Sequence, residues 1–236
     1  MKPSPLRIAS YNLQKCVGLD LRRKPDRSLA VIAGLGAQIV VLQEADKRLP
    51  PRPPALPREM AQAHGWQVAG FGNAGAPLAG SLGFHGNAML LGPEIHLRES
   101  AHIELPGLEP RGAIRAELDT PLGPLRVVGV HLGLIRRHRL MQLGVIVRHL
   151  QQLPPAPTVL AGDFNEWGTA RALDHVTQGL RLLPDRASFP APRPVAPLDR
   201  FALSSELVAH AHGTHSARPA RIASDHLPVW ADLILA

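Results

Sequence analysis

Side chains able to do acid–base or metal chemistry recur in this sequence where apolar runs begin or end. The clearest case is "LAGDFNEW", residues 160–167, in which an apolar run is followed at once by Asp163 and Asn165. Any one such residue is explained by a turn or a helix cap, since Asp and Asn favour both. Their recurrence predicts instead a site to which strands deliver polar groups. The other members are Asn12, Glu44, His131, Asp199, Asp225 and His226.

Three of these residues carry the oxygen ligands that a hard cation prefers. Glu44, in "VLQEAD", is the main candidate, with Asn12 or Asp225 beside it. Mg²⁺ binds such oxygens and keeps several waters, and Mn²⁺ accepts similar ligands. The sequence has no CxxC or HExxH pattern, which disfavours zinc, and no glycine-rich P-loop. We therefore predict a Mg²⁺ site in which Mn²⁺ can substitute.

The remaining members match the other needs of phosphoester hydrolysis. A carboxylate must orient or deprotonate the attacking water, and Asp163 fits that role. Charge developing on phosphoryl oxygens needs hydrogen-bond donors, which Asn165, His131 and His226 supply. A carboxylate partner, Asp199, would keep His226 protonated. The set therefore predicts the hydrolysis of a phosphoester.

The spacing around Phe164 makes a geometric prediction. In an extended segment alternate side chains point to the same side, so Asp163 and Asn165 should face the site while Phe164 packs in the core. The alternative is a polar turn in which Asp163 or Asn165 caps a helix from about Gly168 onward. Asparagine caps a helix about as well as aspartate, so exchanging Asp163 for Asn distinguishes the two accounts.

Apolar periodicity predicts the elements that position these groups. About nine strands are expected, several of them joined without a helix, which indicates two packed sheets with helices outside. Asp26 should be the N-cap of the first helix, and the clean alternation over 114–118 predicts one solvated face. The small-residue loop over 72–86 could flank the site, whereas the proline-rich loops over 50–57 and 184–197 are short or compositionally plain. The expected strands are 6–11, 39–42, 66–71, 87–91, 114–118, 125–132, 158–160, 198–203 and 227–235, and the expected helices are 26–35, a short one ending near 64, 136–152 and 169–176.

Composition narrows the class of protein. The 236 residues are 45% hydrophobic, enough for a substantial core, and no segment has the apolar length of a membrane span. With Cys16 as the only cysteine, no internal disulfide can form. We expect a monomer with one domain over residues 1–236, and a cytoplasmic location because residues 1–5 lead into a strand without an apolar signal region.

The charge balance bears on the partner. A net charge of +7, with 22 arginines and 4 lysines against 19 acids, suits nucleic acid, a phospholipid or a phosphorylated metabolite. Aromatic residues make up only 4% of the chain, fewer than is usual for proteins that hold single strands by stacking. Composition thus favours an anionic substrate without naming it.

The motifs and their order resemble the endonuclease/exonuclease/phosphatase superfamily, which includes deoxyribonuclease I, exonuclease III and neutral sphingomyelinases. The resemblance spans about residues 6–235, and GDFN followed at a distance by SDH is its most specific part. It implies an α/β fold, a four-layer sandwich of two mixed β-sheets with helices outside. The chain is most similar to short bacterial members. The motifs that carry the resemblance are "YNLQK", "VLQEAD", "GNAMLL", "EPRGAIRAEL", "VVGVHLGLIRRHRLMQ", "LAGDFNEW", "LDRFALS" and "SDHLPV".

The resemblance also implies roles, and they agree with the chemistry above. Asn12 and Glu44 match residues that hold Mg²⁺, and Asp225 matches an acid beside the metal. The residues that match those acting on water and phosphate are His131, Asp163, Asn165 and the carboxylate–histidine pair Asp199 and His226. The residues expected to line the substrate cleft are Asn87 and Arg111, together with Arg136 and Arg137 of the basic segment 136–139.

Three functions stay open at this stage. The first is a Mg²⁺-dependent phosphodiesterase or nuclease acting on DNA or RNA. The second is a phospholipid or sugar-phosphate hydrolase, which the basic segment 136–139 suits equally well. The third is a non-catalytic binding module, and the complete polar set speaks against it because binding alone needs no water-activating carboxylate. A panel of DNA, RNA, phospholipid and phosphomonoester substrates would separate them.

Overall fold

The computed structural model describes residues 4–47, 53–72, 80–169, 171, 173–174 and 176–236. Two mixed β-sheets of six strands each dominate the described residues. In the first sheet the strand order is β11-β12-β1-β2-β4-β3. Its strands are β1 (Leu6–Asn12), β2 (Ile39–Gln43), β3 (Gln67–Val68), β4 (Ala88–Leu91), β11 (Leu207–Thr214) and β12 (Val229–Leu235).

The second sheet has the strand order β5-β6-β7-β8-β10-β9. Only the β7–β8 pair is parallel in this sheet, as only the β1–β2 pair is parallel in the first. Its strands are β5 (His96–Glu104), β6 (Gly112–Thr120), β7 (Gly123–His131), β8 (Thr158–Asp163), β9 (Arg181–Leu182) and β10 (Asp199–Leu203).

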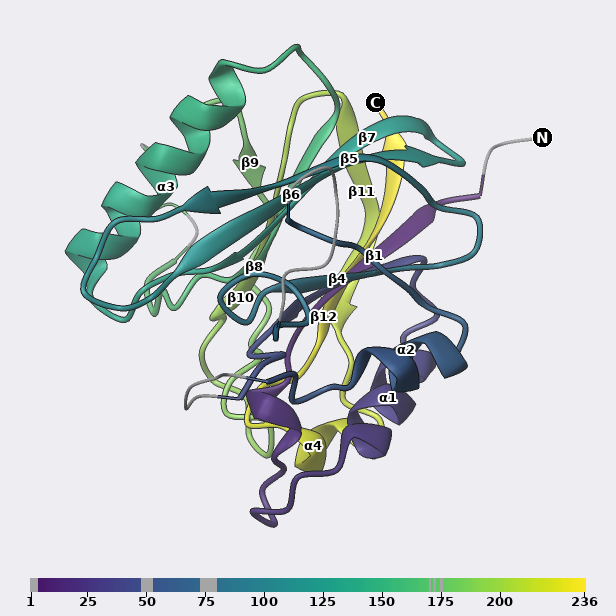
Figure 1. The fold of residues 1–236 in the computed structure, drawn as a ribbon. Coiled ribbons are helices and arrows are strands. Elements are labelled where there is room, and N and C mark those ends of the chain that lie inside the picture. The colour runs from purple at the N-terminus through teal and green to yellow at the C-terminus, as the bar shows by residue number, and fades with distance from the viewer. Residues whose placement is uncertain (1–3, 48–52, 73–79, 170, 172, 175) are drawn as a thin grey trace.

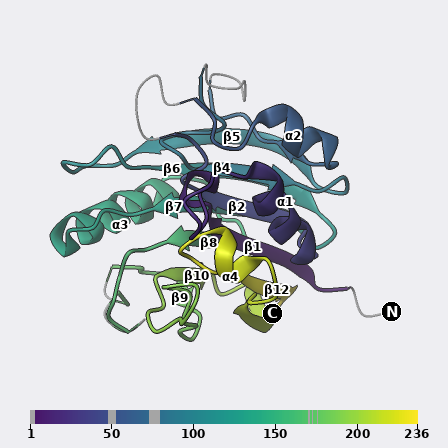
Figure 2. The same cartoon turned by 90° about the horizontal axis from the view of Figure 1, so that it is seen from below.

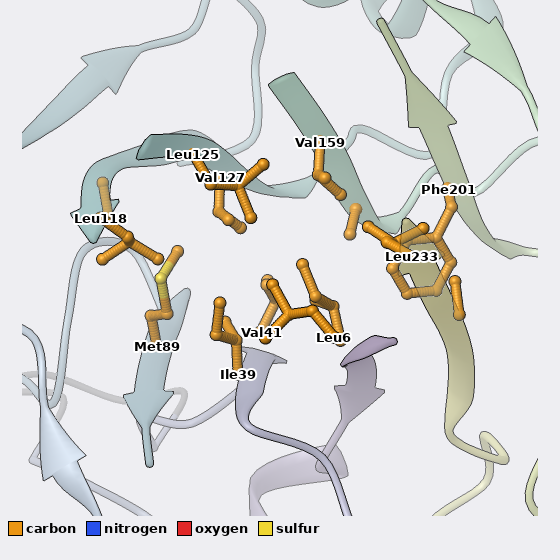
Figure 3. Close-up of a cluster of buried hydrophobic side chains, with 14 of the residues drawn as sticks. Leu6, Ile39, Val41, Met89, Leu118, Leu125, Val127, Val159, Phe201 and Leu233 are labelled. Carbon is orange, nitrogen blue, oxygen red and sulfur yellow. The ribbon is translucent and has the colours of Figure 1, made fainter. Parts of the chain in front are cut away.

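The two sheets pack face to face through alternate apolar side chains. Along β2, Ile39 and Val41 point into the space between the sheets, while Val40 and Leu42 point to the other face. Figure 3 shows this inner core, with the first-sheet side chains directed at those of the second sheet. The facing residues include Leu6, Ile39, Val41 and Met89 on one side and Leu118, Leu125, Val127 and Val159 on the other.

Helices cover the outer faces and complete four layers (Figures 1 and 2). On the first sheet lie α1 (Pro25–Gly34), α2 (Arg58–Ala63) and α4 (Ala220–Ala223), and on the second lies α3 (Arg136–Gln151). The inward side chains of α3 include Leu143 and Ile146, as its sequence pattern predicts. None of the described helices is long and apolar enough to cross a membrane. The four-layer α/β sandwich expected from the motifs is therefore the observed fold.

The start of α1 corrects one expectation. The helix begins at Pro25, with Lys24 as its N-cap, and no side chain caps it. Proline is suited to the first helical position because its missing N–H would have no partner there. Asp26 is therefore not the N-cap. It lies in the first turn, where a carboxylate is stabilised by the helix dipole.

The alternating segment within β6 is not solvated on one face, contrary to the prediction. Arg115 is only 4% exposed and forms ion pairs with Glu99 and Glu117. Glu117 also accepts a hydrogen bond of 2.6 Å from Nε of Arg126 on β7. The polar half of the alternation thus belongs to an ion-pair network whose arginines are buried, which the sequence pattern alone cannot distinguish from a wet face.

Three strands were not predicted, and one was predicted too long. β5 and β11 lie at the edges of their sheets; β5 carries mostly polar residues and two histidines interrupt β11, so both lack the apolar run that identifies inner strands. β9 is only two residues long, and the strand expected over 66–71 is reduced to Gln67–Val68. Parts of the loops 50–57 and 72–86 and of the helix expected over 169–176 lie outside the described residues.

Candidate active site

Asp163, the last residue of β8, has a predicted site residue opposite it on each neighbouring strand. The parallel pairing of β7 and β8 sets His131 beside Asp163, and the antiparallel pairing of β10 and β8 sets Asp199 on its other side. Nε2 of His131 lies 3.6 Å from Oδ2 of Asp163. The end of β7, the end of β8 and the start of β10 therefore meet at one edge of the second sheet.

The first sheet brings two more residues to the same carboxylate. Asn12, at the end of β1, donates a hydrogen bond of 3.0 Å from Nδ2 to Oδ2 of Asp163. Nε2 of His226, which precedes β12, lies 3.8 Å from that same oxygen. Both sheets thus direct polar groups at one buried carboxylate, and five of the predicted residues form a continuous cluster: Asn12, His131, Asp163, Asp199 and His226.

His226 is held as a charged donor. Its Nδ1 lies 2.8 Å from Oδ2 of Asp199, which also accepts a hydrogen bond of 2.6 Å from Oγ of Ser188. Burial opposes the charged ring, but the charge and hydrogen bond of Asp199, with the charges of Asp163 and Asp225, raise the pKa of His226 to about 9. At neutral pH this imidazole is protonated.

The surroundings of Asp163 favour its neutral, protonated form, whereas those of His226 favour the charged form. Burial, followed by the charge of Asp199, raises the pKa of Asp163 to about 6, against the lowering effects of His226, the Asn165 N–H and Asn12. A carboxylate with a pKa close to neutrality is well matched to accept a proton from water. The pair Asp163 and His226 therefore combines a buried base with a nearby charged donor.

His131 is neutral. Burial is the main cause that lowers its pKa, and the charges of Arg111, His226 and Lys15 lower it further. Nη1 of Arg111 lies 2.8 Å from both ring nitrogens of His131. A guanidinium can only donate, so the imidazole accepts from it. Glu109 fixes Arg111 in turn, through a bond of 2.7 Å to Nη2.

The turn after Asp163 differs from the extended geometry predicted for it. Asn165 has a left-handed backbone, φ 51°, and its N–H donates to Oδ1 of Asp163 at 2.8 Å. Its Nδ2 donates to the carbonyl of Leu132 at 2.9 Å, and Phe164 is fully buried, as predicted. Part of the helix expected from about Gly168 lies outside the described residues, and the hydrogen bonds above tie both side chains to the turn itself and to Leu132. The polar turn closes around Asp163.

Glu44 lies just beyond β2 and already holds a cationic group. Its carboxylate forms an ion pair with Nζ of Lys15, and the Lys15 N–H donates to the Glu44 carbonyl at 3.1 Å. Glu44 and three successive residues of the turn η1 (Gln14–Cys16) have positive φ between 46° and 59°, which non-glycine residues rarely adopt. Such strain is concentrated at functional sites.

Asp225 lies on the other side of the same turn. Its N–H donates to Oε1 of Gln14 at 3.1 Å, and its carboxylate accepts a bond of 3.3 Å from Oγ of Ser224. The Ser224 hydroxyl also donates to the carbonyl of Asn12 at 2.7 Å. The segment before β12 is therefore tied to the end of β1, next to the residues around Glu44.

Two groups of side chains could receive a divalent cation. Ligand atoms of Asp163, Asp199 and His226 lie within 4.8 Å of one another. However, Nδ1 of His226 is bonded to Asp199, and the carboxylates of Asp163 and Asp199 already accept hydrogen bonds from Asn12 and Ser188. Glu44 offers oxygen ligands, and the ammonium of Lys15 shows that a cation fits against them. The residues around Glu44 therefore suit a hard, oxygen-coordinated ion better.

The residues expected to line the substrate cleft lie in different environments. Arg111 contacts His131, as described, whereas Asn87 is fully buried and donates from Nδ2 to the Gly112 carbonyl at 2.9 Å. Oδ1 of Asn87 has no hydrogen-bond partner. Arg136 lies 3.7 Å from Glu166 with its side chain 55% exposed, and Arg137 is exposed as well. Asn87 thus bridges the sheets, and the two arginines lie at the surface.

Several residues of the site were not predicted from the sequence. Lys15 was present in the motif "YNLQK", where only the asparagine was selected. Ser188 and Glu109 act on Asp199 and Arg111 through hydrogen bonds; Glu109 begins the motif "EPRGAIRAEL", where only the arginine was selected. Glu166, which follows GDFN directly, is buried and pairs with Nη2 of Arg139 at 3.1 Å.

Comparisons with known proteins identify similar sequences and similar structures. The chain is 32% identical over 164 residues to the uncharacterized protein YbhP of Escherichia coli strain K12. The aligned part covers 65% of this chain and 64% of YbhP. The structure of D. rerio TDP2 complexed with a single-strand DNA product has a TM-score of 0.73 and 18% identity, over 98% of this chain and 99% of that one.

A second solved structure and a family model complete the comparison. The mannosyl-6-phosphatase Bt3783 of Bacteroides thetaiotaomicron VPI-5482 has a TM-score of 0.72 and 18% identity, over 97% of this chain and 99% of that one. At this identity both structures show the shared fold. The model of the Endonuclease/Exonuclease/phosphatase family matches residues 9–226, which contain the whole cluster around Asp163. The chain belongs to the endonuclease/exonuclease/phosphatase family.

Proposed function

We propose that this protein is a Mg²⁺-dependent phosphodiesterase that cleaves DNA or RNA. Members of its family are metal-dependent phosphoester hydrolases. The observation that carries the proposal is the buried Asp163, whose pKa is raised to about 6 and which groups from both sheets contact. The net charge of +7 and the DNA product bound by D. rerio TDP2 favour a nucleic-acid substrate over a neutral one.

In this proposal each residue of the cluster has a separate task. Asp163 takes the proton of the attacking water, while protonated His226, oriented by Asp199, donates to a phosphoryl oxygen. Asn165 uses one amide hydrogen on Leu132, which leaves the second for a phosphoryl oxygen. Neutral His131 accepts from Arg111 with one ring nitrogen and contributes the N–H of the other. These donors stabilise the negative charge that grows as the phosphorus–oxygen bond breaks.

The metal belongs to the same proposal. We assign Glu44 as its direct ligand, with the carboxylate of Asp225 and the amide of Asn12 nearby. When bound, Mg²⁺ would polarise the phosphoryl group and neutralise charge on the leaving oxygen. Lys15, which pairs with Glu44, would be displaced from that carboxylate. Mn²⁺ should substitute because it accepts the same oxygen ligands.

One other substrate class has support. The fold is shared with a mannosyl-6-phosphatase, so a sugar-phosphate or phospholipid hydrolase is the second candidate. The test is a panel of single- and double-stranded DNA, RNA, phosphatidylcholine, sphingomyelin and mannose 6-phosphate, each with Mg²⁺, Mn²⁺ or EDTA. We expect the protein to cleave nucleic acid and EDTA to abolish the cleavage. The variant Asp163→Asn should not cleave it. Metal-dependent turnover confined to lipid or sugar phosphate would replace the nuclease assignment. A cytoplasmic location, a monomeric state and a single domain over residues 1–236 stay predictions.

A further inference from the structure

Trp167 stands at the surface directly after the turn that holds the site. It follows Glu166 in "GDFNEW" and is 63% exposed, although tryptophan is usually among the more buried residue types. Of the three tryptophans, Trp66 and Trp230 are each partly buried against the outer core of the first sheet. An exposed indole four residues after Asp163 therefore needs an explanation other than packing.

A row of rings connects Trp167 with the charged histidine of the site. The ring of Phe189 lies 5.0 Å from the His226 ring, centre to centre, at an interplanar angle of 50°. On its other side Phe189 lies 5.9 Å from the Trp167 ring, in an edge-to-face arrangement with an angle of 81°. Phe189 thus supports the indole from one side and fixes its distance from the reacting groups, while most of the indole surface remains open to solvent.

Positive charge is held by the residue that precedes the indole. Glu166, the residue before Trp167, is buried and forms ion pairs with Arg139 at 3.1 Å and Arg136 at 3.7 Å. Arg136 is 55% exposed at its side chain, so it presents its charge to solvent from an ion pair with the residue that precedes the indole. An exposed flat ring thus lies two ring spacings from His226, and the residue before it holds an exposed arginine.

We propose that Trp167 is a stacking platform for one unpaired nucleobase of the substrate. The inference rests on the proposed phosphodiesterase function and makes it more specific: the strand is held single at the base next to the cleaved phosphate. A base is flat and apolar on its faces and is joined to an anionic backbone, and it therefore matches an indole whose preceding residue holds Arg136. Since few aromatic residues are present in the chain, the stacking is confined to this one position.

A lipid surface is the competing partner. Leu134, Ile135 and Val195 are 66%, 51% and 68% exposed, and exposed apolar side chains near a tryptophan can also insert into a membrane interface. The edge-on support from Phe189 favours the base, because it holds the indole in a fixed orientation, whereas interfacial anchoring requires no such support. The experiment therefore includes a vesicle arm.

Binding is measured by isothermal titration calorimetry in EDTA, so that cleavage does not occur and the result depends neither on turnover nor on the indole that the variants remove. Three probes are used: a thymidine oligonucleotide, an oligonucleotide of equal length in which every base is replaced by an abasic sugar, and phosphatidylglycerol vesicles. The abasic strand keeps the phosphates and removes only the bases. The variants are Trp167→Leu, Trp167→Phe and, as a matched control that removes a different indole, Trp66→Phe.

We expect the thymidine strand to bind more tightly than the abasic strand, and the difference to disappear in Trp167→Leu. A base stacked on an aromatic ring corresponds to about fivefold to 150-fold in affinity. Trp167→Phe should keep part of it, and Trp66→Phe should behave as the unchanged protein. Equal binding of the two strands, or an equal loss of both in Trp167→Leu, would overturn the platform. So would tighter binding to the vesicles than to the thymidine strand.

The test of the stacking platform can fail independently of the test of the proposed function. If the protein hydrolyses no nucleic acid but still distinguishes the two strands through Trp167, the phosphodiesterase assignment fails and the stacking site stands. If it cleaves the thymidine strand and an abasic strand with equal KM, in the unchanged protein and in Trp167→Leu alike, the function stands and the platform is wrong.

Discussion

Nδ1 of His226 lies 2.8 Å from Oδ2 of Asp199, and both side chains are buried. The two residues come from different sheets: Asp199 begins β10 in the second, and His226 precedes β12 in the first. A charged hydrogen bond between sheets stabilises the fold only while the imidazole is protonated. Its effect should therefore be visible in the pH dependence of stability.

The first prediction is that stability is lost between about pH 6.5 and pH 9. The pKa of His226 is raised from 6.5 to about 9 by folding, so its contribution is complete below pH 6.5 and disappears as the pH rises through 9. Asp163, raised from 3.8 to about 6, titrates below this window. By linkage we expect a loss on the order of 1–3 kcal/mol.

Urea unfolding in EDTA at a series of pH values checks this prediction, with His226→Gln as the reference. The variant lacks the titrating ring, so the difference in unfolding free energy between it and the unchanged protein should shrink across the window. Parallel curves for the two proteins would show that the His226–Asp199 contact does not set the charge of the ring.

The second prediction concerns Asp163→Asn. The amide can still accept the N–H of Asn165, so the turn and the fold should be retained. The base is lost, and turnover on any cleaved substrate should fall by about 10²–10⁴-fold. Thermal unfolding is the control. Near-normal turnover in a folded variant would mean that Asp163 serves only the turn.

The third prediction concerns the glycine of "GDFN". A Cβ on Gly162 would lie 2.0 Å from the carbonyl oxygen of Val130 on the adjacent strand, and its φ is 153°. Because backbone cannot give way cheaply, Gly162→Ala should separate β7 from β8, destabilise the protein by about 1–3 kcal/mol and move His131 away from Asp163. Gly144→Ala is the matched control. It lies in α3, where a Cβ meets only the end of Arg148, and should stabilise by about 0.5–1 kcal/mol.

The fourth prediction concerns the metal. Glu44→Gln removes a charged ligand and should weaken Mg²⁺ binding at least about tenfold. Lys15→Met removes the ammonium that pairs with Glu44, and it should strengthen Mg²⁺ binding because the cation no longer displaces a competitor. Isothermal titration calorimetry measures both without a substrate. An unchanged affinity in Glu44→Gln would move the metal to another set of residues, with Asp163, Asp199 and His226 as the first to test.

Much of the fold could be predicted from sequence because buried inner strands appear as continuous apolar runs. The continuous runs at 39–42 and 158–160 mark β2 and β8, and the helical spacing after residue 136 marks α3. Edge strands such as β5 have no such apolar run. β5 reads "HLRESAHIE", in which charge protects an open edge from unwanted pairing, and it cannot be distinguished from a loop.

The residues of the site could be predicted from the sequence more completely than their geometry. Residue type and position at strand ends identify Asp163, His131 and Asp199, since catalytic groups need a rigid support. The left-handed backbone at Asn165 could not be seen, because asparagine tolerates that conformation without requiring it. Likewise, the contact of Arg111 with His131 joins the residue before β6 to the last residue of β7, and no local pattern encodes it.

The position of β1 has a consequence for the synthesis of the chain. β1 is flanked by β2, which follows it by a few tens of residues, and by β12, so that Leu6 lies opposite Leu233. A nascent chain must therefore leave one side of β1 unpaired until β12 emerges from the ribosome, whereas β5, β6 and β7 can pair as soon as they are made. Contacts this distant in sequence form slowly. Because His226 arrives with the same late segment, the nascent chain lacks the complete cluster around Asp163 until translation of this part is almost finished.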